Sequence, residues 1–359
     1  MSSSWLINLE AQAKEKLTRE IYDFVAGGAG NEESLDNNLK AYSNYSVIPR
    51  VLRNASRIDC SLNLTGTKLF SPIIIAPMAP HKLLHERGEI ETVTAASKTN
   101  SLMIVSCMAS QSSLEISKES SEALWFQLHI FKDRTITLNL AKKVESQGYK
   151  ALIITVDMPV VGNRERNRNN KFKIPGNMLA QNLIEEGLIS RKYKNSLNTL
   201  SMNELFDSSI TWQDICWLKN NTSLPIYLKG VLHPQDAIKA LEIGIDGIIL
   251  SNHGARQLDC CVSPLFMLSK IRKILGNKFP IIVDGGIRSG SDVFKALAMG
   301  ASSVLVGRPI LWGLAVGGSY GVSGVLNRLN SELKQVMVLC GVSNLLEITE
   351  YGQSMLFKL

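Results

Sequence analysis

The sequence lacks the patterns that mark metal-binding, secreted or membrane-spanning proteins. Its six cysteines form no C-x-x-C pair and no zinc pattern with histidine, so we predict reduced thiols in a cytoplasmic protein and no metal site. No run of about 18 uninterrupted apolar residues occurs. The N-terminus has no basic stretch followed by an apolar one. We therefore expect neither a membrane span nor a signal peptide.

A strong charge imbalance is also missing. The 39 Lys and Arg residues stand against 32 Asp and Glu residues, and the excess of +7 is spread along the chain without a basic run. This pattern does not indicate a nucleic acid or a membrane surface as a partner. An acidic small substrate or a phosphate-bearing cofactor would explain part of the excess. The final "FKL" differs from a peroxisomal S-K-L signal because Phe357 replaces the small residue, so we keep the cytoplasmic prediction.

What the sequence does contain is an alternation of short β-branched runs with amphipathic segments from about residue 70 onward. The predicted strands are 72–77, 101–106, 124–130, 151–157, 225–230, 247–250, 280–286 and 303–308. The predicted helices are about 88–99, 112–119, 134–147, 233–243, 264–275, 290–299 and 311–317. Eight strands alternating with helices over roughly 250 residues are typical of a (β/α)8 TIM barrel.

A doubly wound open sheet is the alternative fold. Nearly every predicted strand ends in side chains suited to binding or chemistry, for example Gln127, Lys229 and Asp284. In a barrel these ends converge on one mouth, whereas in an open sheet only the crevice near the strand-order switch is used. The convergence favours the barrel.

We expect one domain with three parts. Residues 1–70 form N-terminal helices, over about 5–43, and a hairpin at 59–70 that closes the bottom of the barrel. Residues 71–318 form the barrel, and residues 319–359 form C-terminal helices. The long polar connection at about 160–210 has no clear period, and both a substrate lid and disorder fit it.

Two glycine-arginine segments near the end of the chain indicate a phosphate site. "VDGGIRSG" and "LVGRP" each place glycines and an arginine between a strand and a helix start, so backbone N–H groups and helix dipoles point at one place. These segments follow the seventh and eighth strands, where TIM barrels commonly bind phosphate. The alternative is that the glycines only form tight turns.

Five ionisable residues near the ends of the central strands indicate acid-base chemistry on an acid. Lys229 ends an apolar strand and needs an anionic partner, either a bound group or an internal ion pair. His253 can take a proton near neutral pH, and Arg256, three residues later, can hold a carboxylate together with Arg164. Asp157 can orient His253.

The motifs together resemble a known family. The segments that carry the resemblance are "SNHGARQLD", "VDGGIRSGSDVFKAL", "LVGRP", "IITVDMPVVGNRE" and "FQLHIFKDR". They are similar to the FMN-dependent 2-hydroxy-acid oxidase and dehydrogenase family, which includes glycolate oxidase, lactate oxidase and mandelate dehydrogenase. The resemblance covers about residues 5–350, and "REIYDFVAGGAGNEESLDNN" and "VIPRVLRN" look most like the 4-hydroxymandelate oxidase branch.

The resemblance implies roles for individual residues. His253 would be the base, Asp157 would support it, and Arg164 with Arg256 would hold the substrate carboxylate. The residues implied to surround or hold FMN are Pro77, Met78, Ala79, Ser106, Gln127, Thr155, Lys229, Ser251, Asp284, Gly286, Arg288, Gly307 and Arg308. In the family mechanism the base takes a proton from the substrate hydroxyl or from the α-carbon. The mechanism is argued either as hydride transfer or as passing through a carbanion.

Three substrate-side positions depart from the common family pattern. Many members have tyrosine where Phe24 and His129 stand, and glycolate oxidase has tryptophan where Met108 stands. Phe24 removes a hydrogen bond to the substrate carboxylate and argues against glycolate. His129 can donate a hydrogen bond, and it can also titrate and add a pH dependence. Met108 suggests a pocket of a different shape.

The sequence therefore predicts FMN-dependent oxidation of an L-2-hydroxy acid to the 2-oxo acid, with oxygen (giving hydrogen peroxide) or another molecule as electron acceptor. One alternative is a tailoring oxidase acting on a larger or carrier-bound hydroxy acid in a biosynthetic pathway. Others are a catalytically silent flavin-binding barrel and a flavin-free sugar-phosphate enzyme. The family is often tetrameric, so we expect a homotetramer.

Overall fold

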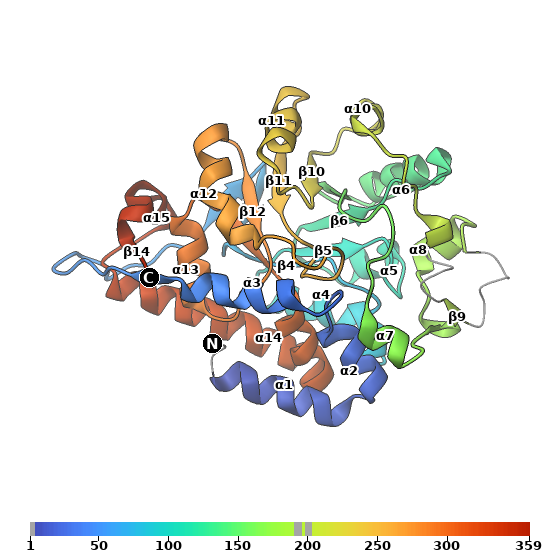
Figure 1. The fold of residues 1–359 in the computed structure, drawn as a ribbon, viewed down its shortest axis with the longest axis horizontal. Coiled ribbons are helices and arrows are strands. Elements are labelled where there is room, and N and C mark those ends of the chain that lie inside the picture. Colours follow the sequence, from blue (N-terminus) through green and yellow to red (C-terminus); the bar gives the residue numbers. More distant parts are fainter. Residues whose placement is uncertain (1–3, 190–195, 198–202) are drawn as a thin grey trace.

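A closed barrel of eight parallel strands forms the centre of the molecule (Figure 1). The computed structural model describes residues 4–189, 196–197 and 203–359. The barrel strands, which pair in chain order, are β4 (Ile73–Ile75), β5 (Met103–Ser106), β6 (Leu124–Leu128), β7 (Leu152–Thr155), β10 (Ile226–Lys229), β11 (Gly247–Leu250), β12 (Ile281–Val283) and β13 (Ser303–Val306). Each lies inside a predicted strand. The (β/α)8 prediction is confirmed, and the open-sheet alternative is wrong.

Helices cover the outside of the barrel. They are α4 (Gly88–Lys98), α5 (Ser113–Lys118), α6 (Arg134–Ser146), α10 (Trp212–Lys219), α11 (Pro234–Glu242), α12 (Pro264–Leu275), α13 (Gly290–Ala298) and α14 (Arg308–Leu339). Sequence reasoning missed α10, which is too short to show a clear period. Its signal is a capping box, in which Thr211 and Asp214 bond each other's backbone N–H groups at the helix start.

Apolar side chains form two layers. The barrel interior holds Trp125, Tyr227, Ile153 and Ile249, and a larger layer lies between the strands and the outer helices. Strands buried on both faces explain why their sequences are almost continuously apolar.

A hairpin of β2 (Leu62–Leu64) and β3 (Thr67–Leu69) closes the bottom of the barrel, as predicted. The hydroxyl groups of Thr65 and Tyr227 share a hydrogen bond of 3.2 Å, and Trp125 Nε1 donates to Thr67 Oγ1 over 3.2 Å. Both aromatic residues stand near the starts of their strands. The opposite mouth, at the strand ends, is therefore the one that stays available.

The last barrel helix, α14, is long and apolar enough to resemble a membrane span. Most of its apolar stretch is buried inside the protein, where it packs against α1, α4 and α13. Non-helical backbone at Gly317 and Gly318 kinks it, and Glu91 accepts a hydrogen bond from Ser319 N just after the kink. These contacts identify α14 as a core helix. It runs across residue 318, where we had predicted the end of the barrel.

The segments outside the barrel hold the two ends of the chain against it. They are α1 (Ser4–Lys16), α2 (Arg19–Ala26), α3 (Glu33–Ser43), β1 (Tyr45–Val47), α15 (Leu345–Tyr351), η4 (Gly352–Met355) and β14 (Leu356–Lys358). In Figure 1, α1 lies along α14, and β1 pairs with β14. The N-terminal helices confirm the helical prediction for that region.

The long connection after β7 contains short elements. They are α7 (Glu165–Asn169), β8 (Ile174–Pro175), η2 (Gly176–Met178), α8 (Gln181–Glu185) and β9 (Ser196–Leu197). Arg166 anchors its first part through ion pairs with Glu32 at 2.5 Å and Asp23 at 3.4 Å. The disorder alternative does not apply to this part of the connection. Residues 190–195 and 198–202 of the predicted lid lie outside the described residues.

Candidate active site

One cavity at the mouth of the barrel gathers almost all the predicted site residues. Those that line it are Phe24, Pro77, Met78, Ala79, Ser106, Gln127, His129, Thr155, Arg164, Lys229, His253, Arg256, Asp284, Gly286, Arg288, Gly307 and Arg308. Asp157 and Ser251 stand directly behind the lining, bonded to His253 and Lys229. The convergence expected of strand ends is thus present, whereas the individual roles of these residues stay predictions.

A buried chain of polar groups crosses the floor of the cavity. Lys229 Nζ donates to Ser251 Oγ over 2.8 Å, and Ser251 Oγ donates to Asp284 Oδ2 over 2.9 Å. Lys229 Nζ also lies 3.2 Å from the same carboxylate oxygen. Burial alone would lower the pKa of Lys229, but the carboxylates of Asp284 and Asp157 outweigh it and raise that pKa. The internal ion pair that we kept as an alternative exists, and its lysine still lines the cavity.

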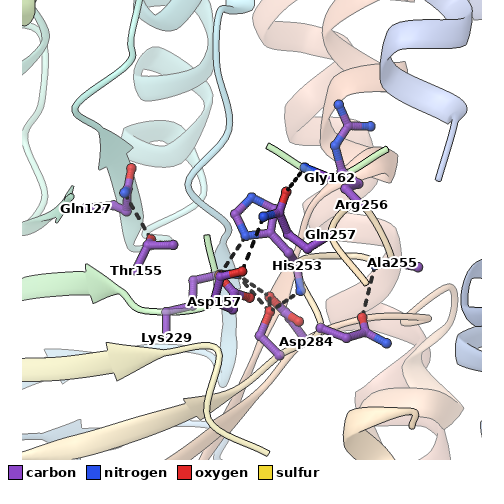
Figure 2. A network of polar contacts seen from close by, with 12 residues as sticks. Gln127, Thr155, Asp157, Gly162, Lys229, His253, Ala255, Arg256, Gln257 and Asp284 are labelled. Atoms are coloured by element: carbon purple, nitrogen blue, oxygen red, sulfur yellow. Dashed lines mark hydrogen bonds and ion pairs between the residues drawn. The ribbon is translucent and has the colours of Figure 1, made fainter. Parts of the chain in front are cut away.

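A second polar row joins three neighbouring strands. Gln127 on β6 accepts a hydrogen bond from Ser106 Oγ of β5 over 2.9 Å. It also donates to Thr155 Oγ1 of β7 over 3.0 Å, as Figure 2 shows. All three side chains line the cavity at the mouth of the barrel. They present a fixed set of donors and acceptors to a ligand lying across the mouth.

His253 and Asp157 form a hydrogen-bonded pair. Nδ1 of His253 lies 2.9 Å from Asp157 Oδ1, and Figure 2 shows the imidazole facing this carboxylate. Burial lowers the pKa of His253, and Asp157 counteracts part of that effect. Burial would raise the pKa of Asp157, but the neighbouring His253 lowers it overall. The carboxylate therefore stays ionised and holds the proton on Nδ1, which leaves Nε2 able to accept one.

Three arginines bring positive charge to the cavity without a carboxylate of their own. In the described part of the chain, none of Arg164, Arg256 and Arg308 forms an ion pair with Asp or Glu. Arg256 and Arg308 instead donate to the backbone oxygens of Val25 and Gly27. Burial lowers the pKa of Arg164 to about 10 and that of Arg308 to about 9. Buried guanidinium groups so placed call for an anionic ligand.

Phe24 positions one of these arginines. The Arg256 guanidinium lies 5.2 Å from the centre of the Phe24 ring, and Phe172 stacks on the same ring at 4.6 Å. A cation over an aromatic face is attracted by the ring quadrupole. Phe24 therefore supports Arg256 through this contact.

The residues present fit FMN. Lys229 offers a buried cation, and Asp284 Oδ1 is buried without a hydrogen-bond partner among the described residues. Gly307 lines the wall without a side chain. Arg308 begins α14 directly after this glycine, at a helix end that favours phosphate. An anionic, planar, polar-edged cofactor satisfies all four features.

His129 is buried beside aromatic rings. Its ring centroid lies 4.6 Å from that of Phe206, and burial lowers its pKa to about 3. The imidazole is therefore neutral in the folded protein over the physiological pH range. We had expected that His129 could titrate and add a pH dependence to activity. With this lowered pKa it adds none near neutral pH.

Replacement of His129 by Phe should reduce the loss of stability in acid. Above about pH 6.5 the imidazole of His129 is neutral in both the folded and the unfolded chain. Between about pH 6.5 and 3 only the unfolded chain binds a proton at His129, so acid favours unfolding. The free energy of unfolding of the wild type should fall by about 2 kcal/mol more than that of the variant between pH 7.5 and 5. Urea unfolding at both pH values measures this, with His233→Asn at an exposed histidine as control. Equal falls in the His129→Phe variant and the wild type would contradict the assignment.

Sequence reasoning missed part of the cavity wall. The missed residues include His81, Leu84, Met158, Ile174, Met178, Leu179 and Ala180. The last four belong to the long connection after β7, whose polar, aperiodic sequence gave no signal of what faces inward. The only available signal was its position directly after Arg164.

Comparison with known proteins agrees with this geometry. Residues 13–354 match the family described as FMN-dependent dehydrogenase. A 2-hydroxyacid oxidase of Dictyostelium discoideum is 42% identical over 341 residues, covering 95% of this chain and 87% of that protein. A peroxisomal (S)-2-hydroxyacid oxidase of Arabidopsis thaliana is 42% identical, covering 94% and 92%. The crystal structure of mandelate oxidase with (S)-4-hydroxymandelic acid superposes with a TM-score of 0.90 at 36% identity, covering 96% and 97%.

Proposed function

The chain belongs to the FMN-dependent dehydrogenase family, and on that premise we propose that it oxidises (S)-2-hydroxy acids with bulky apolar side chains and passes the electrons to oxygen. The reaction class is an FMN-dependent oxidation of a 2-hydroxy acid to the 2-oxo acid. The proposal concerns the choice of acid and of electron acceptor. The His253–Asp157 pair and the unpaired arginines argue against a catalytically silent barrel.

The chain's own residues carry binding and proton transfer. Arg164 and Arg256 bind the substrate carboxylate, whose negative charge stabilises these two buried guanidinium groups. Nε2 of His253 takes the proton released as the carbinol becomes a carbonyl, and Asp157 stabilises the imidazolium that forms. FMN, when bound, would accept the two electrons and the other hydrogen of the oxidation. Lys229, Asp284, Arg288 and Arg308 would hold it together with the Ser106–Gln127–Thr155 row.

The apolar wall carries the proposal for the side chain of the substrate. The apolar wall residues that the cofactor assignment does not use include Leu84, Met108, Met158, Ile174, Met178, Leu179 and Ala180. Four of them follow Arg164 along the chain and line the same cavity as the two arginines that we assign to the carboxylate. Methionine side chains adapt to irregular apolar shapes. A small acid such as glycolate would leave this wall unfilled.

We propose oxygen as the electron acceptor because the relatives are named as oxidases. Transfer of the electrons to oxygen would give hydrogen peroxide. The homotetramer and the cytoplasmic location stay predictions, and the Arabidopsis relative is named as peroxisomal.

Replacement of Met108 by Trp tests the proposed side-chain pocket. Met108 lies two residues beyond β5 and lines the cavity. A tryptophan there should fill the space that a phenyl group needs, so the ratio of kcat/KM for mandelate to that for glycolate should fall at least about tenfold. Steady-state assays with both acids measure the ratio, and glycolate serves as the internal control. A ratio that does not change would mean that Met108 does not border the side-chain pocket.

A further inference from the structure

The turn that carries His253 has an unusual backbone. Three consecutive residues are left-handed, with φ of 59° at His253, 61° at Gly254 and 61° at Ala255. Residues other than glycine adopt this conformation at a cost of roughly 1–2 kcal/mol each, and normally singly. A row of three therefore persists only where surrounding groups hold it.

Two side chains of the same strand end hold the turn directly. Ser251 Oγ accepts a hydrogen bond from His253 N over 2.9 Å. Asn252 Oδ1 accepts one from Ala255 N over 3.0 Å, a contact visible at Ala255 in Figure 2. Ala255 N also donates to the backbone oxygen of Asn252 over 3.0 Å, so the orientation of the Asn252 amide decides whether a side chain reinforces this backbone bond.

Asn38 on α3 holds that orientation, together with a longer hydrogen bond from Asn252 Nδ2 to the backbone oxygen of Val262 at 3.4 Å. Asn38 Nδ2 donates to Asn252 Oδ1, and Asn252 Nδ2 donates to Asn38 Oδ1, each over 2.9 Å. The two residues are almost fully buried, at 2% and 4% exposure. Such a pair cannot rotate without leaving buried polar atoms unbonded, which costs about 1–3 kcal/mol for each group.

The same residue also abuts the neighbouring turn after β12. A Cβ on Gly286 would lie 2.1 Å from the backbone oxygen of Asn38, and one on Gly285 would lie 3.0 Å from its Nδ2. Asn38 thus sits between the turn that carries the base and the turn expected to lie at the cofactor. No residue of α3 lines the cavity, so Asn38 acts from behind it.

We propose that Asn38 is a positioning residue for the reaction: through Asn252 it holds the 253–255 turn left-handed and so keeps His253 aligned with Asp157 and the substrate. The inference rests on the proposed role of His253 as base. Without Asn38 the Asn252 amide can turn away from Ala255 N, and the strained turn can relax. A displacement of the base by about 1 Å can cost about a hundredfold in rate.

The test compares Asn38→Ala with Asn37→Ala, which changes the same residue type at an exposed position on the same helix. Hydrogen exchange of the backbone amides in 251–256 is measured on each holoenzyme, together with anaerobic reduction of the flavin by the preferred hydroxy acid. In Asn38→Ala, exchange in this segment should rise at least about tenfold, because the bonds that close the turn are weakened. The reduction rate constant should fall at least about tenfold while KM changes less than about threefold. Asn37→Ala should match the wild type in both.

Asn38→Asp is the second variant, since it keeps the volume and the acceptor but loses the donor to Asn252. It should show the same two changes, and it replaces Asn38→Ala if that variant fails to fold. Asn252→Ala and the double variant Asn38→Ala/Asn252→Ala should have equal rates within about twofold, because Asn38 acts through Asn252.

Wild-type exchange and rates in both Asn38 variants would overturn the proposal, as would additive losses in the double variant. If the wild type oxidises no hydroxy acid, the proposed function fails. The exchange of the 251–256 amides still decides whether Asn38 holds the turn.

Discussion

Replacement of His253 by Gln should leave the flavin bound and slow its reduction by the hydroxy acid at least about a hundredfold. Glutamine has a similar reach but cannot take a proton, so the step assigned to Nε2 loses its acceptor. In this variant Asp157 also loses the imidazole Nδ1, which lies 2.9 Å from its Oδ1 in the wild type. Stopped-flow absorbance under anaerobic conditions measures the rate constant at saturating substrate.

His233→Gln is the matched control, because this histidine is exposed at the start of α11 and does not line the cavity. It should reduce its flavin at the wild-type rate. A His253→Gln enzyme that is reduced as fast as the control would remove His253 from the mechanism.

The second large effect is expected at the internal ion pair. Replacement of Lys229 by Met leaves the Asp284 carboxylate buried beside an apolar chain, and breaking such a pair costs about 3–5 kcal/mol. The free energy of unfolding in urea should fall by that amount, and the protein should retain less flavin. Lys239→Met breaks an exposed pair with Glu242 and should cost less than about 1 kcal/mol. Equal losses in the two variants would contradict the buried-pair account.

The fold and the cofactor end of the site could be predicted because their signals are local. A parallel strand buried on both faces is a short apolar run, and the residue that ends it is polar only where it meets a ligand or another polar group. Lys229 after "IYL" and Asp284 after "IIV" are such positions, and barrel closure then brings them within 3.2 Å. The phosphate segments carry glycines at fixed distances from strand and helix.

The substrate end could not be predicted in the same way. The wall residues Met178 and Leu179 lie in an aperiodic segment, where neither helical nor strand period marks an inward face. The stack of Arg256, Phe24 and Phe172 joins three segments distant in sequence, and no local pattern encodes it. Asn38 lies on a helix outside the barrel, and only the folded chain shows that its amide meets Asn252.

The structure gives a physical reason for two departures from the common family pattern, Phe24 and His129. Phe24 makes a contact with a guanidinium that needs no hydroxyl group. His129 is held neutral by burial, so it can offer a hydrogen bond without adding charge beside His253. Neither change adds a charge beside His253. They alter the fit for the substrate and leave the acid-base pair intact.

The most direct test of the central claim is the visible spectrum of the purified protein under anaerobic conditions, before and after addition of mandelate, 4-hydroxymandelate, lactate or glycolate. The account predicts an oxidised flavin band that bleaches fastest with the (S)-acids of bulky apolar side chain, and that returns when oxygen is admitted. A flavin band that none of these acids bleaches, or a protein without any flavin band, would contradict it.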